Sequence, residues 1–266
     1  MNSTLAGTQN RAASRGRVRN ALGYLLAFVF KDLPIYFYTA MCGTASVCGS
    51  IFDAHGRWQH GCARVWSRLI LKTSGIRLRV EGAEHIDRKE TVIFCANHPS
   101  AMDIPVLFLA LPVQFRYLAK QSLFHIPFLG WHLRRSGHIP VERGNPHHAL
   151  KGFERAAQRI REGNSVVMFP EGRRSRTAEM LPFKAGSFYL AVRSGVPIVP
   201  ITIKGTREIL EPDSLHVRPG EAEIVIHPPI PTRGLTAEDV TALSARVRRQ
   251  IVSRLDSGGN QAPRAV

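Results

Sequence analysis

Cysteine is scarce in this sequence, and the few cysteines are not arranged for metal binding or redox chemistry. The 266 residues include four of them, Cys42, Cys48, Cys62 and Cys95. No pair forms a C-x-x-C motif, which excludes a zinc knuckle or a thioredoxin-like site. Two of the four lie in an apolar run, where cysteine usually acts as a small hydrophobic residue. We therefore expect a reducing compartment, no disulfides and no metal site.

Acidic residues are also few compared with basic ones. The chain has 36 Lys and Arg against 20 Asp and Glu, a formal net charge of +16. Such a charge calls for an anionic partner: nucleic acid, a membrane surface or anionic substrates. The basic residues are spread along the chain, without a zinc finger, an aromatic ribonucleoprotein motif or a helix-turn-helix signature. The charge therefore favours an anionic membrane and anionic substrates, and we expect no nucleic-acid partner.

Internal repeats are absent, and the length suits one domain of ordinary size. We divide the chain into a basic disordered tail at 1–20, a membrane-inserting helical segment at 21–60, a main folded domain at 61–256 and a second tail at 257–266. The first tail is polar and rich in arginine, which is typical of a disordered arm.

Two apolar stretches, Ala21–Phe30 and Leu33–Phe52, follow the basic tail. The second approaches the roughly 20 residues that a membrane-spanning helix needs. A cleaved signal peptide is disfavoured because a second, longer apolar stretch follows the first. A single span would leave basic residues on both flanks, against the positive-inside rule. A hairpin that enters the membrane and returns avoids this conflict, and a pair of buried core helices is the alternative.

From residue 76 onward, patterns typical of strands alternate with patterns typical of helices. Strands are predicted at 76–81, 91–96, 116–119, 138–142, 165–169, 197–204 and 221–227. Helices are predicted at 146–162, at 185–194 and after a cap formed by Thr236 and Asp239. The last helix should face inward with Val240, Leu243, Val247 and Ile251. The two prolines of Val196–Ile201 predict an edge strand or a strand terminus.

This alternation predicts the fold class. We expect an α/β fold with a mixed, largely parallel sheet flanked by helices, preceded by an N-terminal apolar helical membrane hairpin.

A histidine and an aspartate lie close together in Asn97–Asp103 (NHPSAMD), directly after a predicted buried strand. The carboxyl ends of such strands are where open α/β sheets carry their sites. His98 suits a general base near neutral pH, and Asp103 could accept its other ring N–H and fix the tautomer. The alternative is that Ser100 caps a helix, Asp103 closes a capping box and His98 has no role.

Two further segments carry charge to the ends of predicted strands. Phe169–Ser175 (FPEGRRS) combines an acid, a glycine and two arginines. The glycine permits close backbone approach and a guanidinium can bond phosphate through a fork, which suits an anionic head group. Gly137–Arg143 (GHIPVER) brings an arginine to its strand end. A solvated turn and an ordinary surface arginine are the respective alternatives.

In their order, the blocks N-H-x-x-x-x-D, G-x-I-x-x-x-R, F-P-E-G and V-P-I-V-P resemble the glycerophospholipid acyltransferase family, whose best-known members acylate lysophosphatidic acid. The resemblance covers about residues 75–230. It implies that His98 is the catalytic base and Asp103 its partner. It also implies acceptor and phosphate contacts at Arg143, Glu171, Gly172 and Arg174, with Lys120 as a further candidate. The chain departs from the family pattern at Arg173, usually threonine, and at Glu142, usually aspartate, which leaves the head group of the acceptor open.

The resemblance implies a direct acyl transfer. An acyl-CoA or acyl-ACP thioester would acylate the sn-2 hydroxyl of 1-acylglycerol 3-phosphate, giving phosphatidic acid without a further cofactor. A covalent intermediate on Ser100 is disfavoured because no G-x-S-x-G elbow surrounds it. The expected partners are a lysophospholipid, acyl-CoA or acyl carrier protein, and an anionic membrane, with the site on the cytoplasmic side of a bacterial inner membrane.

Two other functions stay open at this point. The same chemistry could act on another lysolipid, such as a lyso-ornithine lipid. A non-enzymatic basic protein that binds membranes or nucleic acid would explain the charge but not the pairing of His98 with Asp103.

Overall fold

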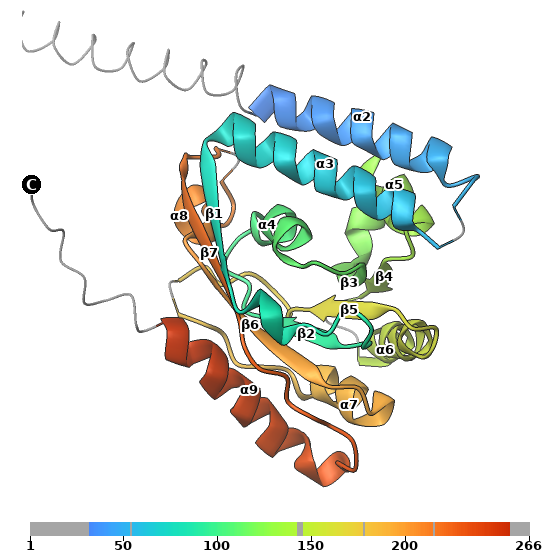
Figure 1. Ribbon diagram of the computed structural model, residues 1–266, viewed down its shortest axis with the longest axis vertical. Helices are drawn as coiled ribbons and strands as arrows, with labels where there is room; N and C mark the ends of the chain where they lie inside the picture. Colours follow the sequence, from blue (N-terminus) through green and yellow to red (C-terminus); the bar gives the residue numbers. More distant parts are fainter. Residues whose placement is uncertain (1–31, 54, 143–145, 178, 215, 256–266) are drawn as a thin grey trace, which may run out of the picture.

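The computed structural model describes residues 32–53, 55–142, 146–177, 179–214 and 216–255 (Figure 1). The predicted tails at 1–20 and 257–266, the apolar stretch Ala21–Phe30 and Arg143 all lie outside the described residues.

One seven-stranded sheet runs through the molecule in the order β1-β7-β6-β2-β5-β3-β4. Its strands are β1 (Ile76–Glu81), β2 (Ile93–Ala96), β3 (Phe115–Lys120), β4 (Ile139–Val141), β5 (Ser165–Met168), β6 (Ile198–Lys204) and β7 (Gly220–Ile226). β6 and β7 pair antiparallel, and every other neighbouring pair is parallel. The prediction of a mixed, largely parallel sheet is confirmed, and each predicted strand is present within two residues at either end.

Helices cover both faces of the sheet (Figure 1). Those on one face are α2 (Leu33–Gly49), α3 (Arg57–Ser74), α4 (Asp103–Ala110) and α5 (Leu129–Arg135), and those on the other are α6 (Pro146–Arg161), α7 (Ala185–Ser194) and α9 (Val240–Leu255). The short α8 (Thr206–Ile209) follows β6 directly.

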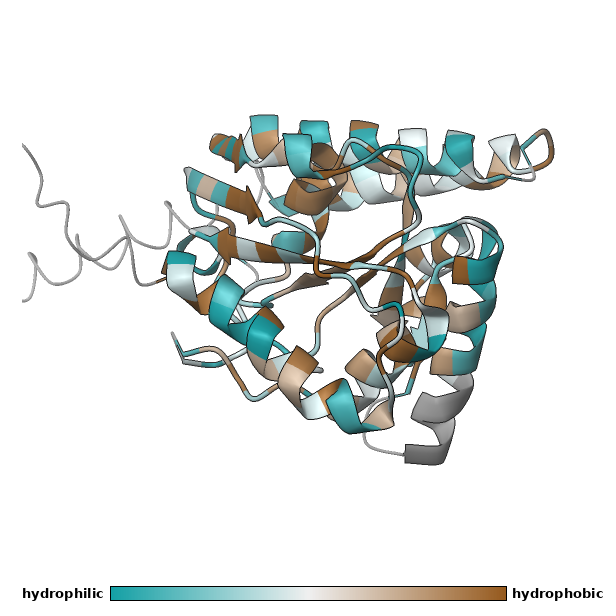
Figure 2. Cartoon of the chain, turned by 60° about the horizontal axis from the view of Figure 1, so that its bottom comes forward, coloured by the Kyte–Doolittle hydropathy of each residue, from teal (hydrophilic) through white to brown (hydrophobic). Residues whose placement is uncertain are grey.

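Strand β2 shows why the sheet has a separate hydrophobic core on each face. Phe94 and Ala96 belong to the core under α3 and α4, whereas Ile93 and Cys95 belong to the core under α6, α7 and α9. All four side chains are completely buried. Because both faces are covered, the strand is a continuous apolar run and not an alternating one. Figure 2 shows hydrophobic residues along the central strands and hydrophilic ones on the helices around them.

The predicted cap of the last helix is confirmed. The backbone N–H of Thr236 donates to Asp239 Oδ2 at 2.7 Å, and the reciprocal bond completes a capping box. The four inward positions predicted for this helix are all buried. A capping box satisfies backbone donors that a helix start would otherwise leave unpaired, so this local sequence signal is enough to fix where the helix begins.

The two prolines lie at the start of β6, as the strand-terminus alternative predicted, whereas the edge-strand alternative is wrong. β6 lies in the middle of the sheet, between β7 and β2. The Pro200 carbonyl accepts the His227 N–H at 3.0 Å, one residue after β7 ends at Ile226. The N–H that proline lacks would point to the same side, where the neighbouring strand has already ended. The sheet therefore loses no internal ladder bond to this proline.

The N-terminal helices α2 and α3 lie side by side along one face of the molecule (Figure 1). Within the described ranges, no helix is both long and apolar enough to cross a membrane. The predicted membrane hairpin is therefore not supported: its first arm lies outside the described residues, and α2 is followed by the amphipathic α3. The boundary expected at residue 60 falls inside α3. Two α2 side chains, Tyr36 and Phe37, are nonetheless 56% and 63% exposed.

Helix α3 places a histidine in the core beneath it. The His60 ring packs edge-on against Phe108 and Phe115, with centroids 5.3 and 5.0 Å away. Neither ring nitrogen has a hydrogen-bond partner in the described part of the chain. Burial lowers the pKa of His60 to about 3, and the positive charges of Arg116 and Arg64 act in the same direction. The ring is therefore neutral in the folded protein.

We predict that His60→Leu makes stability less sensitive to acid. Below the ordinary histidine pKa of about 6.5, the unfolded chain binds a proton that folded His60 refuses until about pH 3, so stability falls as pH falls. Between pH 7 and 5 this loss amounts to about 2 kcal/mol. Urea unfolding at both values should show the loss reduced by that amount in the variant. Exposed His125→Leu is the control, and an equal reduction there would contradict the assignment.

Candidate active site

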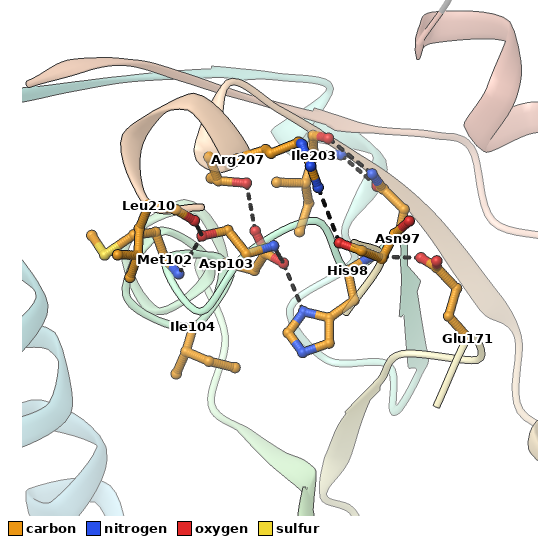
Figure 3. Close-up of polar contacts among 12 residues, drawn as sticks. Asn97, His98, Met102, Asp103, Ile104, Glu171, Ile203, Arg207 and Leu210 are labelled. Atoms are coloured by element: carbon orange, nitrogen blue, oxygen red, sulfur yellow. Dashed lines mark hydrogen bonds and ion pairs between the residues drawn. The ribbon is translucent and has the colours of Figure 1, made fainter. Parts of the chain in front are cut away.

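His98 and Asp103 meet at the carboxyl end of β2. The loop after β2 leads into α4, and His98 Nδ1 lies 2.7 Å from Asp103 Oδ2 (Figure 3). Asp103 is fully buried and His98 is 8% exposed. This edge of a parallel sheet is where α/β folds carry their sites. A hydrogen bond from Nδ1–H to the carboxylate leaves Nε2 with a free lone pair, the state that a general base requires.

Three donors hold the Asp103 carboxylate. Oδ2 accepts from His98 and from the Ser100 backbone N–H at 3.0 Å, and Oδ1 accepts from the Thr206 hydroxyl at 2.6 Å. A buried carboxylate needs such compensation for its lost hydration. The Ser100 contact closes the turn that leads into α4, whose N-cap is Met102 without a side-chain cap bond, so the predicted cap by Ser100 is not observed.

The Ser100 hydroxyl is engaged elsewhere. It donates to the Leu210 carbonyl at 2.7 Å and accepts the Met102 backbone N–H at 3.2 Å. Ser100 is completely buried. Its proton is thus directed to the Leu210 carbonyl oxygen, and its oxygen holds the turn before α4.

Glu171 supports His98 through the backbone. Its Oε1 accepts the His98 N–H at 2.7 Å, and its Oε2 accepts the Leu181 N–H at 2.8 Å (Figure 3). Burial raises the pKa of Glu171, while the bonds from Leu181 and His98 act in the opposite direction. An acceptor contact at Glu171 stays a prediction. The contacts that the structure gives it position the loop of the histidine.

Two more side chains lock the loops around the pair. Asn97 bonds both the N–H and the carbonyl of Ile203, at 2.8 and 2.9 Å, which ties the loop after β2 to β6. Arg207 in α8 donates to the three consecutive carbonyls of residues 175–177 at 2.7–3.0 Å. The loops after β2, β5 and β6 are thereby joined.

Aromatic rings cover one side of His98. Its imidazole stacks on Phe169 with centroids 4.0 Å apart and planes 17° apart. Tyr117 continues the column, stacked 6.2 Å from Phe169, and His138 follows at 5.7 Å. The stack shields one face of the His98 imidazole from water and restricts rotation of the ring.

The predicted head-group residues lie at the same edge of the sheet. Lys120 is exposed at the end of β3, and Arg174 is half-buried in the loop after β5. Gly172 has φ 74°, and a Cβ there would approach Lys184 Cε to 2.8 Å. The Gly172 N–H donates to the Phe169 carbonyl at 3.0 Å. Gly172 therefore makes a tight turn under a lysine that the sequence analysis gave no role.

An apolar cavity opens between α2, α3, α5 and β3. Its walls include Cys42, Ala63, Trp66, Ile104 and Tyr117. Ile104 follows Asp103 in the chain, and Tyr117 belongs to the ring stack on His98. The cavity thus approaches the histidine pair from the side of the N-terminal helices.

Sequence reasoning missed Thr206 and Arg207. Both follow β6 directly, at the same sheet edge as His98. A hydroxyl and an arginine just after a buried strand are the same kind of signal that singled out the other loops. The two prolines mark the start of this strand, and no comparable motif marks its end.

Known proteins share this arrangement. The family model described as Acyltransferase matches residues 77–204, which contain all four motif blocks. A 1-acyl-sn-glycerol-3-phosphate acyltransferase of Saccharomyces cerevisiae is 30% identical over 239 residues, covering 87% of this chain and 78% of that protein. The chain belongs to the acyltransferase family. The family resemblance predicted from the motifs is confirmed.

Other relatives show how much of each known protein this chain covers. A chloroplastic 1-acyl-sn-glycerol-3-phosphate acyltransferase of Brassica napus is 32% identical over 183 residues, covering 68% of this chain and 53% of that protein. The acyltransferase thus spans about half the length of this relative. The crystal structure of the 1-acyl-sn-glycerophosphate acyltransferase PlsC from Thermotoga maritima has a TM-score of 0.79 at 23% identity, covering 93% of this chain and 99% of that one. The two chains share the fold.

We predict that Thr206→Val destabilises the acyltransferase and that Thr206→Ser largely restores it. Valine keeps the volume but removes the hydroxyl from a buried carboxylate, which costs about 1–3 kcal/mol. Serine keeps the donor to Asp103. Urea unfolding of both variants measures the difference. Equal stability of the two would show that the hydroxyl contributes nothing to holding Asp103.

Proposed function

We propose that the acyltransferase moves a fatty acyl chain from an acyl-CoA or acyl-ACP thioester to the sn-2 hydroxyl of 1-acylglycerol 3-phosphate. The products are phosphatidic acid and a free thiol. The observation that carries this proposal is the pair His98–Asp103, joined at 2.7 Å at the edge of a parallel sheet. Family membership and the names of the relatives support the same activity.

The proposed mechanism needs one base and no covalent intermediate. His98 Nε2 removes the proton from the acceptor hydroxyl while Asp103 stabilises the imidazolium that forms. The acceptor oxygen attacks the thioester carbonyl to give a tetrahedral oxyanion. Its collapse breaks the carbon–sulfur bond, and the imidazolium returns its proton to the departing thiolate. The thioester supplies the driving force, and we propose no further cofactor.

The basic residues of this edge suit the phosphate of the acceptor. Lys120 and Arg174 follow the neighbouring strands β3 and β5, and Arg143 follows β4 in the sequence. A guanidinium can bond two phosphate oxygens at once, which favours arginine over other cations here. We propose that these three residues bind the head group and that Gly172 shapes the turn that brings Arg174 there.

The N-terminal side suits the acyl chains. The apolar cavity reaches Ile104, the neighbour of Asp103, and α2 exposes Tyr36 and Phe37 beside it. We propose that an acyl chain enters this cavity from the membrane interface and that the protein lies on the cytoplasmic side of a bacterial inner membrane. The net charge of +16 supports attraction to anionic lipids.

A different acceptor remains the second candidate. Glu142 and Arg173 replace residues that the family pattern usually has in its head-group blocks, so another lysolipid, such as a lyso-ornithine lipid, could take the acyl chain by the same chemistry. A non-enzymatic membrane- or nucleic-acid-binding role would leave the buried His98–Asp103 pair unused.

The decisive experiment measures acyl transfer by the purified acyltransferase. Acyl-CoA and acyl-ACP would be offered with 1-acylglycerol 3-phosphate and a panel of other lysolipids. We expect phosphatidic acid from the first acceptor and a loss of about 10²–10⁴-fold in His98→Ala, the usual contribution of a general base. Transfer to another lysolipid alone would overturn the acceptor. Full activity of the variant would overturn the base.

We predict that Glu171→Gln lowers kcat and leaves both KM values within about twofold. An amide has one oxygen, so it cannot accept both the His98 and the Leu181 N–H, and the loop of the base loses its fixed position. A shift of about 1 Å in a catalytic group can cost about 10²-fold. Exposed Glu84→Gln is the matched control. A raised acceptor KM with unchanged kcat would instead indicate direct acceptor binding by Glu171.

A further inference from the structure

A second cavity lies beside the edge strand β4, and His138 separates it from the apolar one. Helices α5 and α6 and the turn at Gln121–His125 enclose it. Three arginines line it, Arg134 from α5 and Arg155 and Arg159 from α6. No acidic side chain is among the lining residues that the structure describes. The proposed mechanism uses none of these groups.

Two of the three arginines lack an acidic partner in the described part of the chain. Arg159 donates from Nη1 to Glu162 at 2.8 Å, on the solvent side of the same helix. Arg134 and Arg155 are exposed and have no hydrogen bond or ion pair within the described ranges. Like charges that gather in one hollow repel one another, and an anion bound among them removes that repulsion.

A fourth arginine lies behind the cavity. Gly137 has φ 74°, and a Cβ there would lie 3.4 Å from Arg116 Nε and 3.6 Å from Arg159 Nη2. Two guanidinium groups therefore converge on a residue without a side chain. Arg116 is only 5% exposed, and it donates to the His55 carbonyl at 2.8 Å. No carboxylate bonds to it in the described part of the chain, so its charge adds to that of the cavity.

The shape of the cavity favours a small anion with an apolar part. Phe124, Ile139 and Pro140 line it between the arginines, and the Gln121 side chain adds an amide. A hollow with an apolar wall suits a purine ring with attached phosphates, which arginine forks can bond from several sides. A membrane surface or an acidic protein helix would need a flat or convex basic patch.

The position of the cavity fits one particular nucleotide. Gln121 directly follows Lys120, at the same sheet edge as His98, whereas Arg159 lies with Gly137 and Arg116 toward the amino ends of the strands. β4 is separated from β2 by three strand spacings, about 14 Å. An extended pantetheine arm bridges a distance of this order between a nucleotide and its thioester.

We propose that this cavity binds the phosphate-bearing adenine nucleotide end of coenzyme A, so that the thioester of an acyl-CoA reaches His98 along the sheet edge. The proposal rests on the proposed function, because a donor site serves acyl transfer. Its test measures binding and does not require acyl-transfer activity. It selects acyl-CoA as the donor and assigns Arg134, Arg155 and Arg159 to its phosphates.

The test is direct binding of coenzyme A and of 3′-dephospho-coenzyme A to the full chain in detergent, measured by calorimetry. Arg134→Gln and Arg155→Gln should each weaken coenzyme A binding roughly tenfold, since a hydrogen bond to a charged group is worth about one factor of ten. Arg135→Gln and Arg161→Gln are matched controls: they remove the same charge from the same two helices outside the cavity. The cavity variants should also lose preference for the 3′-phosphate.

Each outcome decides for or against the nucleotide. Equal binding by cavity and control variants, or no discrimination between the two ligands, overturns the proposal. Reduced acyl transfer from acyl-ACP in the cavity variants, without coenzyme A binding by the wild type, would assign the cavity to an acidic carrier protein instead. If coenzyme A binds as expected but no lysolipid is acylated, the proposed function fails and the nucleotide site stands.

If the enzyme is active, steady-state kinetics of the cavity variants test the proposal independently. The cavity variants should raise KM for acyl-CoA about tenfold, with kcat and the KM for the lysolipid unchanged, because they touch only the far end of the donor. A raised KM for the lysolipid alone would show that the arginines bind the acceptor, against the proposal.

Discussion

The buried carboxylate of Asp103 is the constraint on which the site depends. A carboxylate without solvent must have its oxygens bonded, and here the three donors come from two parts of the chain, the loop after β2 and the start of α8. His98 and Ser100 lie in the loop before α4, and Thr206 is the first residue of α8. Satisfying one charge therefore fixes the imidazole, the start of a helix and the end of β6 at the same time. If any one donor is lost, the Asp103 carboxylate keeps too few hydrogen bonds to offset its lost hydration.

Rigid elements hold this carboxylate in place. The loops after β2, β5 and β6 belong to neighbouring strands of one sheet, and Asn97, Glu171 and Arg207 join them through backbone groups. Sites carried by strands and supported by such contacts need little rearrangement when substrate binds. The aromatic stack on His98 adds to this order, since it restricts rotation of the imidazole. Most of these residues support the site through the backbone and not through the reacting atoms.

The sequence predicted the strands, the cap of α9 and the His98 motif because each has a local physical signal. Periodicity reveals a strand, and a capping box places its bonds within four residues. The central place of β6 and the role of Thr206 depend on partners more than 20 residues away, for which one sequence offers no signal. The apolar run of α2 was likewise ambiguous, because hydrophobicity does not tell a helix packed on protein from one inserted in lipid. Glu171 was recognised by its motif, yet its backbone contacts became visible only in the fold.

The N-terminal helix pair has a consequence for how this family can vary. α3 contributes Ala63, Ile70 and Leu71 to the core of one sheet face, and Ser46 of α2 bonds His132 of α5 at 2.7 Å. These helices are thus part of the same cooperative unit as the sheet, and no cut between residues 49 and 76 would release a smaller autonomous domain. A contact made by α2 is therefore connected to the loop of His98 through packed side chains. The segment cannot be exchanged for an unrelated leader, as a tethered domain could be, without repacking the core on one face of the sheet.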